Sequence, residues 1–495
     1  MKNLKRILTI LLAIIMCVSI VGCGKTEDKG NDTSTPTGNT TSDVTESEDG
    51  DVLKPDDTSS TESAASTESN TSSTQAPAVP DNNDYVEVTG SKQEKLFGNL
   101  KGTKLRVPGN VKQTDWEKKF IEQFEKKYGI DVTIVPMSFA EQQTKLPSII
   151  ASKDKKNYID VCTLSNVVFL RYAYGNMIKD FTKYVDKTDS NWTYKDANFP
   201  AFNQYTLNDK IYGSHSIEDH ETYIFYNKTY FKEKGIKDPY EDYYLKNNWT
   251  FDTFRQVAKQ SVSYAKDGKT IATYGFATWN YFAFAQAAGN SVIKQNGNKW
   301  EVNITDKNGM AALNLLYECA NDNSIAPFST VNYFKSRKVA MFIERPSYAT
   351  GSLDAYNTMS DKVGMVPMPK LDKNADYYFP VSADGIGVAA CAQNVPGAVA
   401  WIYEYNKAIE QRNSVEPGLT NYRKRLSVEH EKIRKEYLKK AKPSYSLVDG
   451  LSGWYNGKGN REKFLDMIIE EKKNPAVTLD SLLPLLKDSL KATVG

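Results

Sequence analysis

The sequence has almost no net charge, few histidines and few cysteines, and each shortage excludes a class of function. Its 63 basic and 61 acidic residues leave a net charge of +2, so nucleic acid is not expected as a partner. The three histidines are too scattered along the chain to form a metal site. None of the five cysteines stands in a C-x-x-C or other metal-type spacing. We therefore expect no metal and no other cofactor.

The chain also lacks the short motifs of several enzyme classes. It contains no G-x-S-x-G nucleophile turn and no G-x-x-x-x-G-K-[ST] phosphate loop. His220 and Glu221 are adjacent, but the second histidine of an H-E-x-x-H zinc motif is missing. We therefore do not expect an enzyme. Paired carboxylates for glycoside hydrolysis have no fixed spacing in sequence, so a glycan-active enzyme stays open as an alternative.

Only the N-terminus carries a long apolar run. Lys2, Lys5 and Arg6 precede the apolar stretch 7–21, which is too short to cross a bilayer and is typical of a signal peptide. The segment that ends at Cys23 resembles the bacterial lipobox, in which this thiol receives a lipid and becomes the new N-terminus. The resemblance implies a lipid anchor on the extracellular face of the cell membrane. A plain secretion signal with an incidental cysteine is the alternative.

Residues 24–94 are rich in serine, threonine, aspartate and glutamate and contain few apolar residues. Such a composition cannot bury enough surface to offset the entropy of ordering, so we expect a disordered linker. As a flexible coil of ~60 residues it would span on the order of 45 Å. A tether of this kind would lift a folded domain off the membrane, and its length favours a Gram-positive cell.

Three cysteines remain after the signal segment, namely Cys162, Cys319 and Cys391. Each lies in an apolar run that reads as a strand or a helix, so we expect buried thiols that pack as small apolar residues. One disulfide with one leftover thiol is the alternative.

From residue 95 onward the sequence alternates between strand patterns and helix patterns, which indicates an α/β fold with mainly parallel sheets. Thr114 and Glu117 have the spacing of a capping box at the start of a helix that Gly129 would end. Thr250, and Asn394 with Pro396, are further helix starts. Expected helices also cover 139–152, 167–174 and 309–320, and expected strands cover 104–107, 130–135, 158–163, 224–226, 339–343, 363–366 and 386–390.

Five segments resemble, in the same order, the extracellular solute-binding proteins of ATP-driven importers. This family, solute-binding protein family 1, includes maltose-binding and other sugar-binding lipoproteins. The segments are 116–135, 159–181, 224–228 with 249–251, 339–343 and 363–369. The resemblance implies a two-lobed, type II periplasmic-binding-protein-like fold over residues 95–495. We expect one lobe at about 95–222 and 361–392, and the other at about 223–360 and 393–495.

The resemblance also implies which residues contact the ligand between the lobes. Aromatic rings pack on the apolar faces of sugars, and polar side chains pair with the hydroxyl groups. The expected aromatic contacts are Trp279, Tyr281, Tyr348, Trp454 and Tyr455. The expected polar contacts are Asn166, His220, Glu221, Arg345 and Asp384. The alternative is that the rings belong to the core, that Asp384 caps the turn at Gly385 and that Arg345 forms a surface ion pair.

The function that the resemblance implies is capture of a carbohydrate, an oligosaccharide in particular, and its delivery to an ABC importer. The expected partners are the carbohydrate, the permease subunits and the membrane through the lipid anchor, and we expect a monomer. A lipid-anchored glycan-active enzyme and a ligand-sensing surface lipoprotein are the alternatives. The sequence does not identify the solute, and the many aromatic residues with balanced charge favour a neutral glycan.

Overall fold

The computed structural model describes residues 91–495 apart from 195–198, 216–220, 279, 328–330, 347–357, 382–383, 416–425 and 455–458. The signal segment, Cys23 and nearly all of the linker therefore lie outside the described residues. The described residues all belong to one compact unit. In the part of the chain that is described, no helix is long and apolar enough to cross a membrane.

The first lobe is built around short, buried strands. Strand β3 (Val161–Leu164) pairs with β17 (Gly385–Val388), and β17 pairs on its other side with β8 (Gly213–His215). Strands β1 (Lys104–Gly109) and β2 (Asp131–Pro136) form a parallel pair beside β3. The helices of this lobe are α2 (Lys92–Lys95), α3 (Asp115–Tyr128), α4 (Phe139–Ser152), α5 (Phe169–Tyr174) and α13 (Val395–Val415).

Short elements complete the first lobe between α5 and β8. They are η1 (Thr182–Tyr184), η2 (Ser190–Trp192), β4 (Thr193–Tyr194), β5 (Phe199–Pro200), η3 (Asn203–Tyr205), β6 (Thr206–Leu207) and β7 (Lys210–Ile211). Buried side chains of this stretch, such as Phe181 and Trp192, join the apolar cluster under α3 and α13.

The second lobe contains a five-stranded sheet in the order β10-β11-β14-β9-β15. Its strands are β9 (Tyr223–Asn227), β10 (Ser263–Tyr264), β11 (Ile271–Ala277), β14 (Val339–Glu344) and β15 (Val363–Pro367). Every residue of β9 and β14 is buried, as expected for central strands covered on both faces. The elements packed around this sheet are α6 (Lys228–Lys234), η4 (Pro239–Tyr244), α7 (Phe251–Gln260), α9 (Lys307–Asn321) and α10 (Val331–Lys335).

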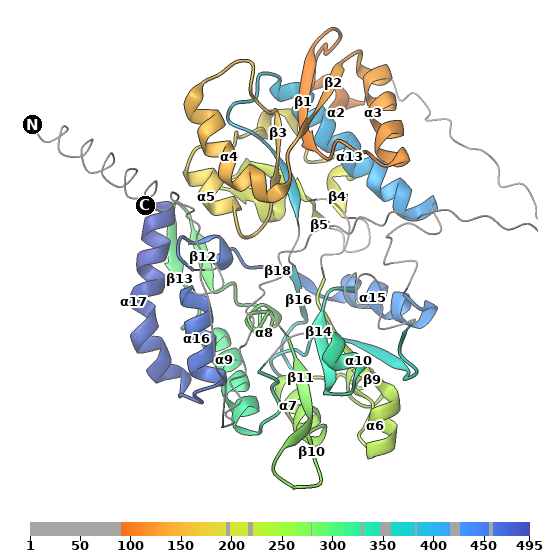
Figure 1. Cartoon of the computed structure of the whole chain (residues 1–495), viewed down its shortest axis with the longest axis vertical. Helices are drawn as coiled ribbons and strands as arrows, with labels where there is room; N and C mark the ends of the chain where they lie inside the picture. The colour runs from red at the N-terminus through yellow and green to blue at the C-terminus, as the bar shows by residue number, and fades with distance from the viewer. Residues whose placement is uncertain are drawn as a thin grey trace, which may run out of the picture. The chain divides into compact units, whose positions relative to one another are not determined.

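The C-terminal part of the chain adds helices to the second lobe. α16 (Asn460–Ile469) and α17 (Pro475–Val494) pack on each other and on α9, as Figure 1 shows in dark blue and green. The remaining elements are α8 (Ala283–Ala287), the hairpin β12 (Ile293–Asn296) and β13 (Lys299–Val302), β16 (Tyr378–Val381), α15 (Val428–Lys440), β18 (Lys442–Tyr445) and η5 (Val448–Gly450).

The helix-start signals in the sequence are confirmed. Thr114 Oγ1 accepts the Glu117 N–H at 3.2 Å, and Glu117 Oε2 accepts the Thr114 N–H at 2.7 Å. Gly129 ends α3 with a φ of 64°, a left-handed conformation that favours glycine. At the start of α13, Asn394 Oδ1 accepts the Gly397 N–H at 2.9 Å. These local bonds explain why α3 and α13 begin where they do.

The expected boundaries differ from the structure at three places. The linker was expected to reach residue 94, but α2 begins at Lys92, and its buried Gln93 donates to the Tyr184 carbonyl at 2.7 Å. The second lobe was expected to exclude 361–392, but β15 pairs with β9 and therefore belongs to the second-lobe sheet. The first lobe was expected to end at 392, but α13 packs its Trp401 against Phe120 and Phe124 of α3. Figure 1 shows α13 in light blue beside the orange α3. The α/β fold is confirmed, but the expectation of mainly parallel sheets is wrong. β17 pairs antiparallel with β3 and β8 in the first lobe, and β9 pairs antiparallel with β14 and β15 in the second.

Candidate functional site

The carboxyl ends of the first-lobe strands meet at one edge. β1 and β2 run parallel, and β1 lies next to β3 because the Asp160 N–H donates to the Arg106 carbonyl at 2.8 Å. Gly385 at the start of β17 pairs with Leu164 at the end of β3, which brings Asp384 to this edge as well. Open α/β sheets bind ligands beyond the carboxyl ends of their strands.

A cavity of about 260 Å³ opens at this edge. This volume far exceeds the roughly 10–15 Å³ that one water needs. Apolar strand residues and the α3 residue Ile121 contribute to its wall, together with three aromatic rings, four polar residues and Asp384. The aromatic residues are Phe120, Trp401 and Tyr405, and the polar ones are Asn110, Gln113, Glu117 and Thr163.

The three rings of the cavity form one packed group. The Phe120 ring meets Trp401 edge to face with centroids 4.8 Å apart and meets Tyr405 at 5.6 Å. Trp401 is buried, whereas Tyr405 is half-buried. Because α3 and α13 fix these rings against each other, the apolar wall is preorganised.

Asp384 links this cavity to the second lobe. Its side chain is exposed, yet the protein around it partly desolvates the carboxyl group and raises its pKa, while the positive charge of Arg345 lowers that pKa. Arg345 directly follows β14, and its Nε lies 3.8 Å from Glu344 Oε1. Two of the residues expected at the site are therefore close enough to interact.

The second-lobe sheet presents the same kind of edge. β11 and β14 run parallel, and β14 and β15 are both antiparallel to β9, so these three strands end at one edge. Thr278 and Arg345 are the residues that follow β11 and β14. Trp279, expected to contact the ligand, comes next after Thr278, but it lies outside the described residues, as do His220, Tyr348 and Tyr455.

Asn166 also lies between the two lobes. It follows β3, and its Nδ2 donates to Asp449 Oδ2 of η5 at 3.3 Å. Asp449 lies in turn 3.5 Å from Arg461 Nη1. Burial raises the pKa of the Asp449 carboxyl group, and the charge of Arg461 opposes that rise. The amide nitrogen of Asn166 is therefore already engaged by η5.

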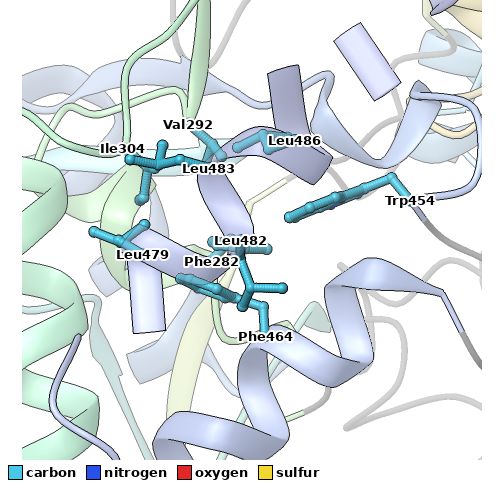
Figure 2. Close-up of a pocket in the computed structure, with 9 residues that line it drawn as sticks. All are labelled: Phe282, Val292, Ile304, Trp454, Phe464, Leu479, Leu482, Leu483 and Leu486. Carbon is cyan, nitrogen blue, oxygen red and sulfur yellow. The ribbon is translucent and has the colours of Figure 1, made fainter. Parts of the chain in front are cut away.

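The structure places Trp454 in the core, which corrects the expectation that it faces a ligand. Only 1% of the residue is exposed, and its ring stacks with Phe282 at a centroid distance of 6.4 Å. Figure 2 shows its indole among Phe282, Phe464 and leucines of α17, around a void of about 10 Å³. The neighbouring glycines suggest a loop, but apolar side chains from distant helices cover the ring.

Glu221 is a second correction. It is completely buried, and its Oε1 accepts from Arg434 Nη1 of α15 at 2.8 Å, with Arg434 also completely buried. Glu431 Oε2 accepts from Arg434 Nε at 2.9 Å. Glu221 therefore neutralises a buried guanidinium rather than reaching a ligand. Tyr281 is partly buried against the second-lobe core, and burial raises the pKa of its hydroxyl group.

The cavity residues Asn110, Gln113, Glu117, Trp401 and Tyr405 are absent from the sequence-based expectation. A signal for the first three exists, because they follow the first strand of an α/β fold, where binding residues gather. No such signal exists for Trp401 and Tyr405, since they lie inside a helix whose pattern resembles that of any core helix.

Comparisons with known proteins agree on one fold. A family model described as bacterial extracellular solute-binding protein matches residues 110–403. An ABC substrate-binding protein of Listeria monocytogenes, solved with cycloalternan, is 17% identical with a TM-score of 0.56 over 79% of this chain and 99% of its own. An extracellular solute-binding protein of Staphylococcus aureus, solved with maltose, is 15% identical with a TM-score of 0.58, over 79% of this chain and 98% of its own.

A third solved structure carries a different ligand. It is UgpB of Mycobacterium tuberculosis in complex with glycerophosphocholine, 14% identical with a TM-score of 0.54 over 78% of this chain and 98% of its own. At sequence identities this low, the similarity shows a shared fold and nothing finer. A comparison with curated protein sequences gives no significant match.

Proposed function

Since the chain belongs to the bacterial extracellular solute-binding proteins, we propose that it captures a carbohydrate outside the cell and delivers it to an ABC importer. The ligand is an oligosaccharide held between the two lobes. It is released chemically unchanged, so the protein acts as a carrier and not as an enzyme.

The observation that carries this proposal is the mixed lining of the first-lobe cavity. Phe120, Trp401 and Tyr405 offer flat apolar surface, and amides and carboxylates stand beside them. A sugar ring has the matching chemistry, with apolar C–H faces and hydroxyl groups at its rim. Buried polar groups that meet no partner cost free energy, so a site with this lining favours a hydroxyl-rich ligand over a purely apolar one.

The ligands in the solved structures are consistent with a sugar for this chain, but they do not by themselves identify the ligand class. The Listeria and Staphylococcus proteins were solved with cycloalternan and with maltose, whereas the Mycobacterium protein was solved with glycerophosphocholine. The fold therefore accommodates more than one ligand class. The lining of this chain's own cavity is what favours a carbohydrate.

We assign the ligand contacts to both sheet edges. Arg345, Asp384 and Asn166 supply polar groups, together with His220. Trp279, Tyr348 and Tyr455 supply rings from the second lobe and the C-terminal region, with Tyr281 behind them. Closure of the lobes would bring these groups onto the ligand and form the surface that the permease subunits recognise.

The place of action follows from the N-terminal segment. Cys23 carries the lipid, the segment from residue 24 up to α2 acts as the tether, and the binding unit stands on the extracellular face of the membrane as a monomer. Replacement of Cys23 by serine tests this part separately. The variant should appear in the culture medium, whereas the unmodified protein should stay with the membrane fraction.

The binding function is tested by thermal and chemical unfolding of the purified protein against a panel of oligosaccharides. A true ligand at 100-fold excess over its Kd stabilises the folded state by about 2.7 kcal/mol. Chromatography of the ligand after overnight incubation should recover it intact. A panel without any stabilising carbohydrate contradicts the proposal, and consumption of the ligand points to the glycan-active enzyme.

A further inference from the structure

We propose that the first-lobe cavity selects its sugar by charge, so that it favours a ring with a protonated amino group and disfavours one with a carboxylate. This inference rests on the proposed function, because it names the class of carbohydrate that the same site takes. It is argued from the charges that line and surround the cavity.

The two charged side chains that line the cavity are both acidic. Among its described lining residues, Glu117 and Asp384 carry carboxyl groups, and none is lysine, arginine or histidine. Asn110 and Gln113 are neutral amides that serve a charged or an uncharged sugar equally. A cavity with negative groups on its wall attracts a cation and repels an anion over the few ångströms that separate wall and ligand.

Glu117 is held in place by the start of α3. Its Oε2 accepts from the Thr114 N–H at 2.7 Å and from Thr114 Oγ1 at 2.9 Å. None of the hydrogen bonds recorded for the described residues involves its Oε1. One carboxylate oxygen thus fixes the side chain, while the other remains able to accept a hydrogen bond from a ligand. A charge-assisted bond from an ammonium group would be the strongest of these.

The N-terminus of α3 is an opposing effect, since helix N-termini attract anions. The helix dipole amounts to roughly +0.5 of an elementary charge at this end. The carboxylate of Glu117 stands on the same turn with a full negative charge, and it already binds one of the free N–H groups. The net charge of the helix dipole and the Glu117 carboxylate at this end of the cavity is therefore negative.

Three basic residues adjoin these acidic groups, and they do not reverse this balance. The positive charge of Arg345 interacts with Asp384 and offsets part of its negative charge, but Arg345 does not line the cavity. Lys118 lies on the exposed side of α3 and pairs with Asp115 at 3.3 Å. Lys112 stands in the loop before α3 and is exposed, where salt screens its charge.

The aromatic wall adds to the preference. A cation over the face of a tryptophan, tyrosine or phenylalanine ring is attracted by the ring's negative face, whereas an anion is not. Tyr405 is half-buried beside Phe120 and contributes its ring to the cavity wall. Carboxylates and aromatic faces in one cavity therefore favour the same ligand charge.

The test uses three sugars of the same ring configuration that differ in charge, namely glucosamine, glucose and glucuronate. Calorimetric titration of the full-length protein at low salt and pH 6.5 should give a Kd at least tenfold lower for glucosamine than for glucuronate. Glucose should lie between them. Raising the salt concentration to 0.3 M should narrow the gap, because screening weakens the charge effect.

Variants assign the effect to the cavity. Glu117→Gln keeps a side chain that can complete the capping box, and Asp384→Asn keeps the shape of its residue. Each should reduce the ratio of the glucuronate Kd to the glucosamine Kd at least threefold. Glu122→Gln, on the same helix and outside the cavity, is the matched control and should leave the ratio unchanged. Unfolding midpoints of all variants verify that they are folded.

The outcomes separate this inference from the function on which it rests. If glucuronate binds as tightly as glucosamine, or if Glu117→Gln and Asp384→Asn leave the ratio as it was, charge selection is wrong and the carbohydrate function stands. If oligosaccharides of the panel bind while none of the three sugars does, charge selection is again wrong. If no carbohydrate binds at all, both proposals fail.

Discussion

Trp454 and Trp279 have different roles in this protein, and replacing each by alanine distinguishes these roles. Trp454→Ala removes a ring that is 1% exposed and packed on Phe282, so it should cost about 3–5 kcal/mol of unfolding free energy. Trp279→Ala, at a proposed ligand contact, should weaken oligosaccharide binding by about 2 kcal/mol with little loss of stability. Urea unfolding and titration of both variants provide the measurement, and the reverse pattern would contradict the assignment.

Because Glu221 and Arg434 form a buried ion pair, we expect a small change to one of these side chains to lower the stability of the protein strongly. Glu221→Gln leaves a fully buried guanidinium with only Glu431 as a charged partner among the described residues, so we expect a loss of about 3 kcal/mol in unfolding free energy. The exposed pair Lys145 and Glu141 is the control, because Lys145→Ala should change stability by about 0.5 kcal/mol or less. Equal effects from the two variants would refute the distinction.

At the scale of elements, α15 has a titratable group in its first turn. His430 is buried, and desolvation lowers its pKa from 6.5 to about 4, an effect that Glu429 opposes and Lys228 supports. The unfolded chain therefore binds a proton at a higher pH than the folded one. The stability that neutral His430 contributes is complete above pH 6.5 and is lost as the pH falls towards 4.

His430→Gln should remove this dependence. With 1.36 kcal/mol for each unit of pKa, the native protein should lose about 3 kcal/mol more than the variant between pH 7 and pH 4. Urea midpoints at a series of pH values measure the difference. Parallel pH profiles for the two proteins would show that His430 gains a proton without opening α15.

The elements also show what the sequence can and cannot predict. The helix expected at 139–152 agrees with α4 from end to end, because α4 is fixed by the local chain, including a capping box between Ser138 and Glu141. The lobe boundaries cannot be predicted in this way. β15 belongs to the second lobe because it pairs with β9, which lies more than a hundred residues earlier in the chain. The same reason applies to the site: the strand ends predict Arg345 and Asp384, whereas burial of Trp454 depends on distant α17.

At the scale of the whole binding unit, a few polar contacts join the lobes away from the sheet edges. Trp300 Nε1 of β13 donates to the Tyr174 hydroxyl of α5 at 2.6 Å. Gln295 Nε2 of β12 donates to Asn208 Oδ1 at 2.7 Å. Helix α17 also packs against α5. Contacts of this kind contribute to the balance between open and closed lobes.

Tyr174→Phe should shift that balance towards the open form. Loss of one hydrogen bond is worth about 0.5–1.5 kcal/mol, which corresponds to roughly a two- to tenfold weaker ligand affinity if the closed form binds. Solution scattering should show a larger radius of gyration without ligand. Tyr264→Phe, at a residue with 49% exposure, is the control, and equal behaviour of both variants would contradict a role for this contact.

The cysteines of the described residues are all free thiols. Cys162 and Cys319 are buried, burial raises the pKa of Cys319 to about 12, and Cys391 donates its thiol hydrogen to the Ile159 carbonyl at 3.3 Å. Cys391 is only partly buried, unlike the expectation that all three thiols are buried. Oxidants and alkylating reagents attack thiolates, and the sulfur atoms of Cys162 and Cys319 rarely ionise or meet solvent. These two thiols are therefore protected by packing even in an oxidising environment. The rate at which a thiol dye labels Cys162 and Cys319 consequently measures how often the folded protein opens spontaneously.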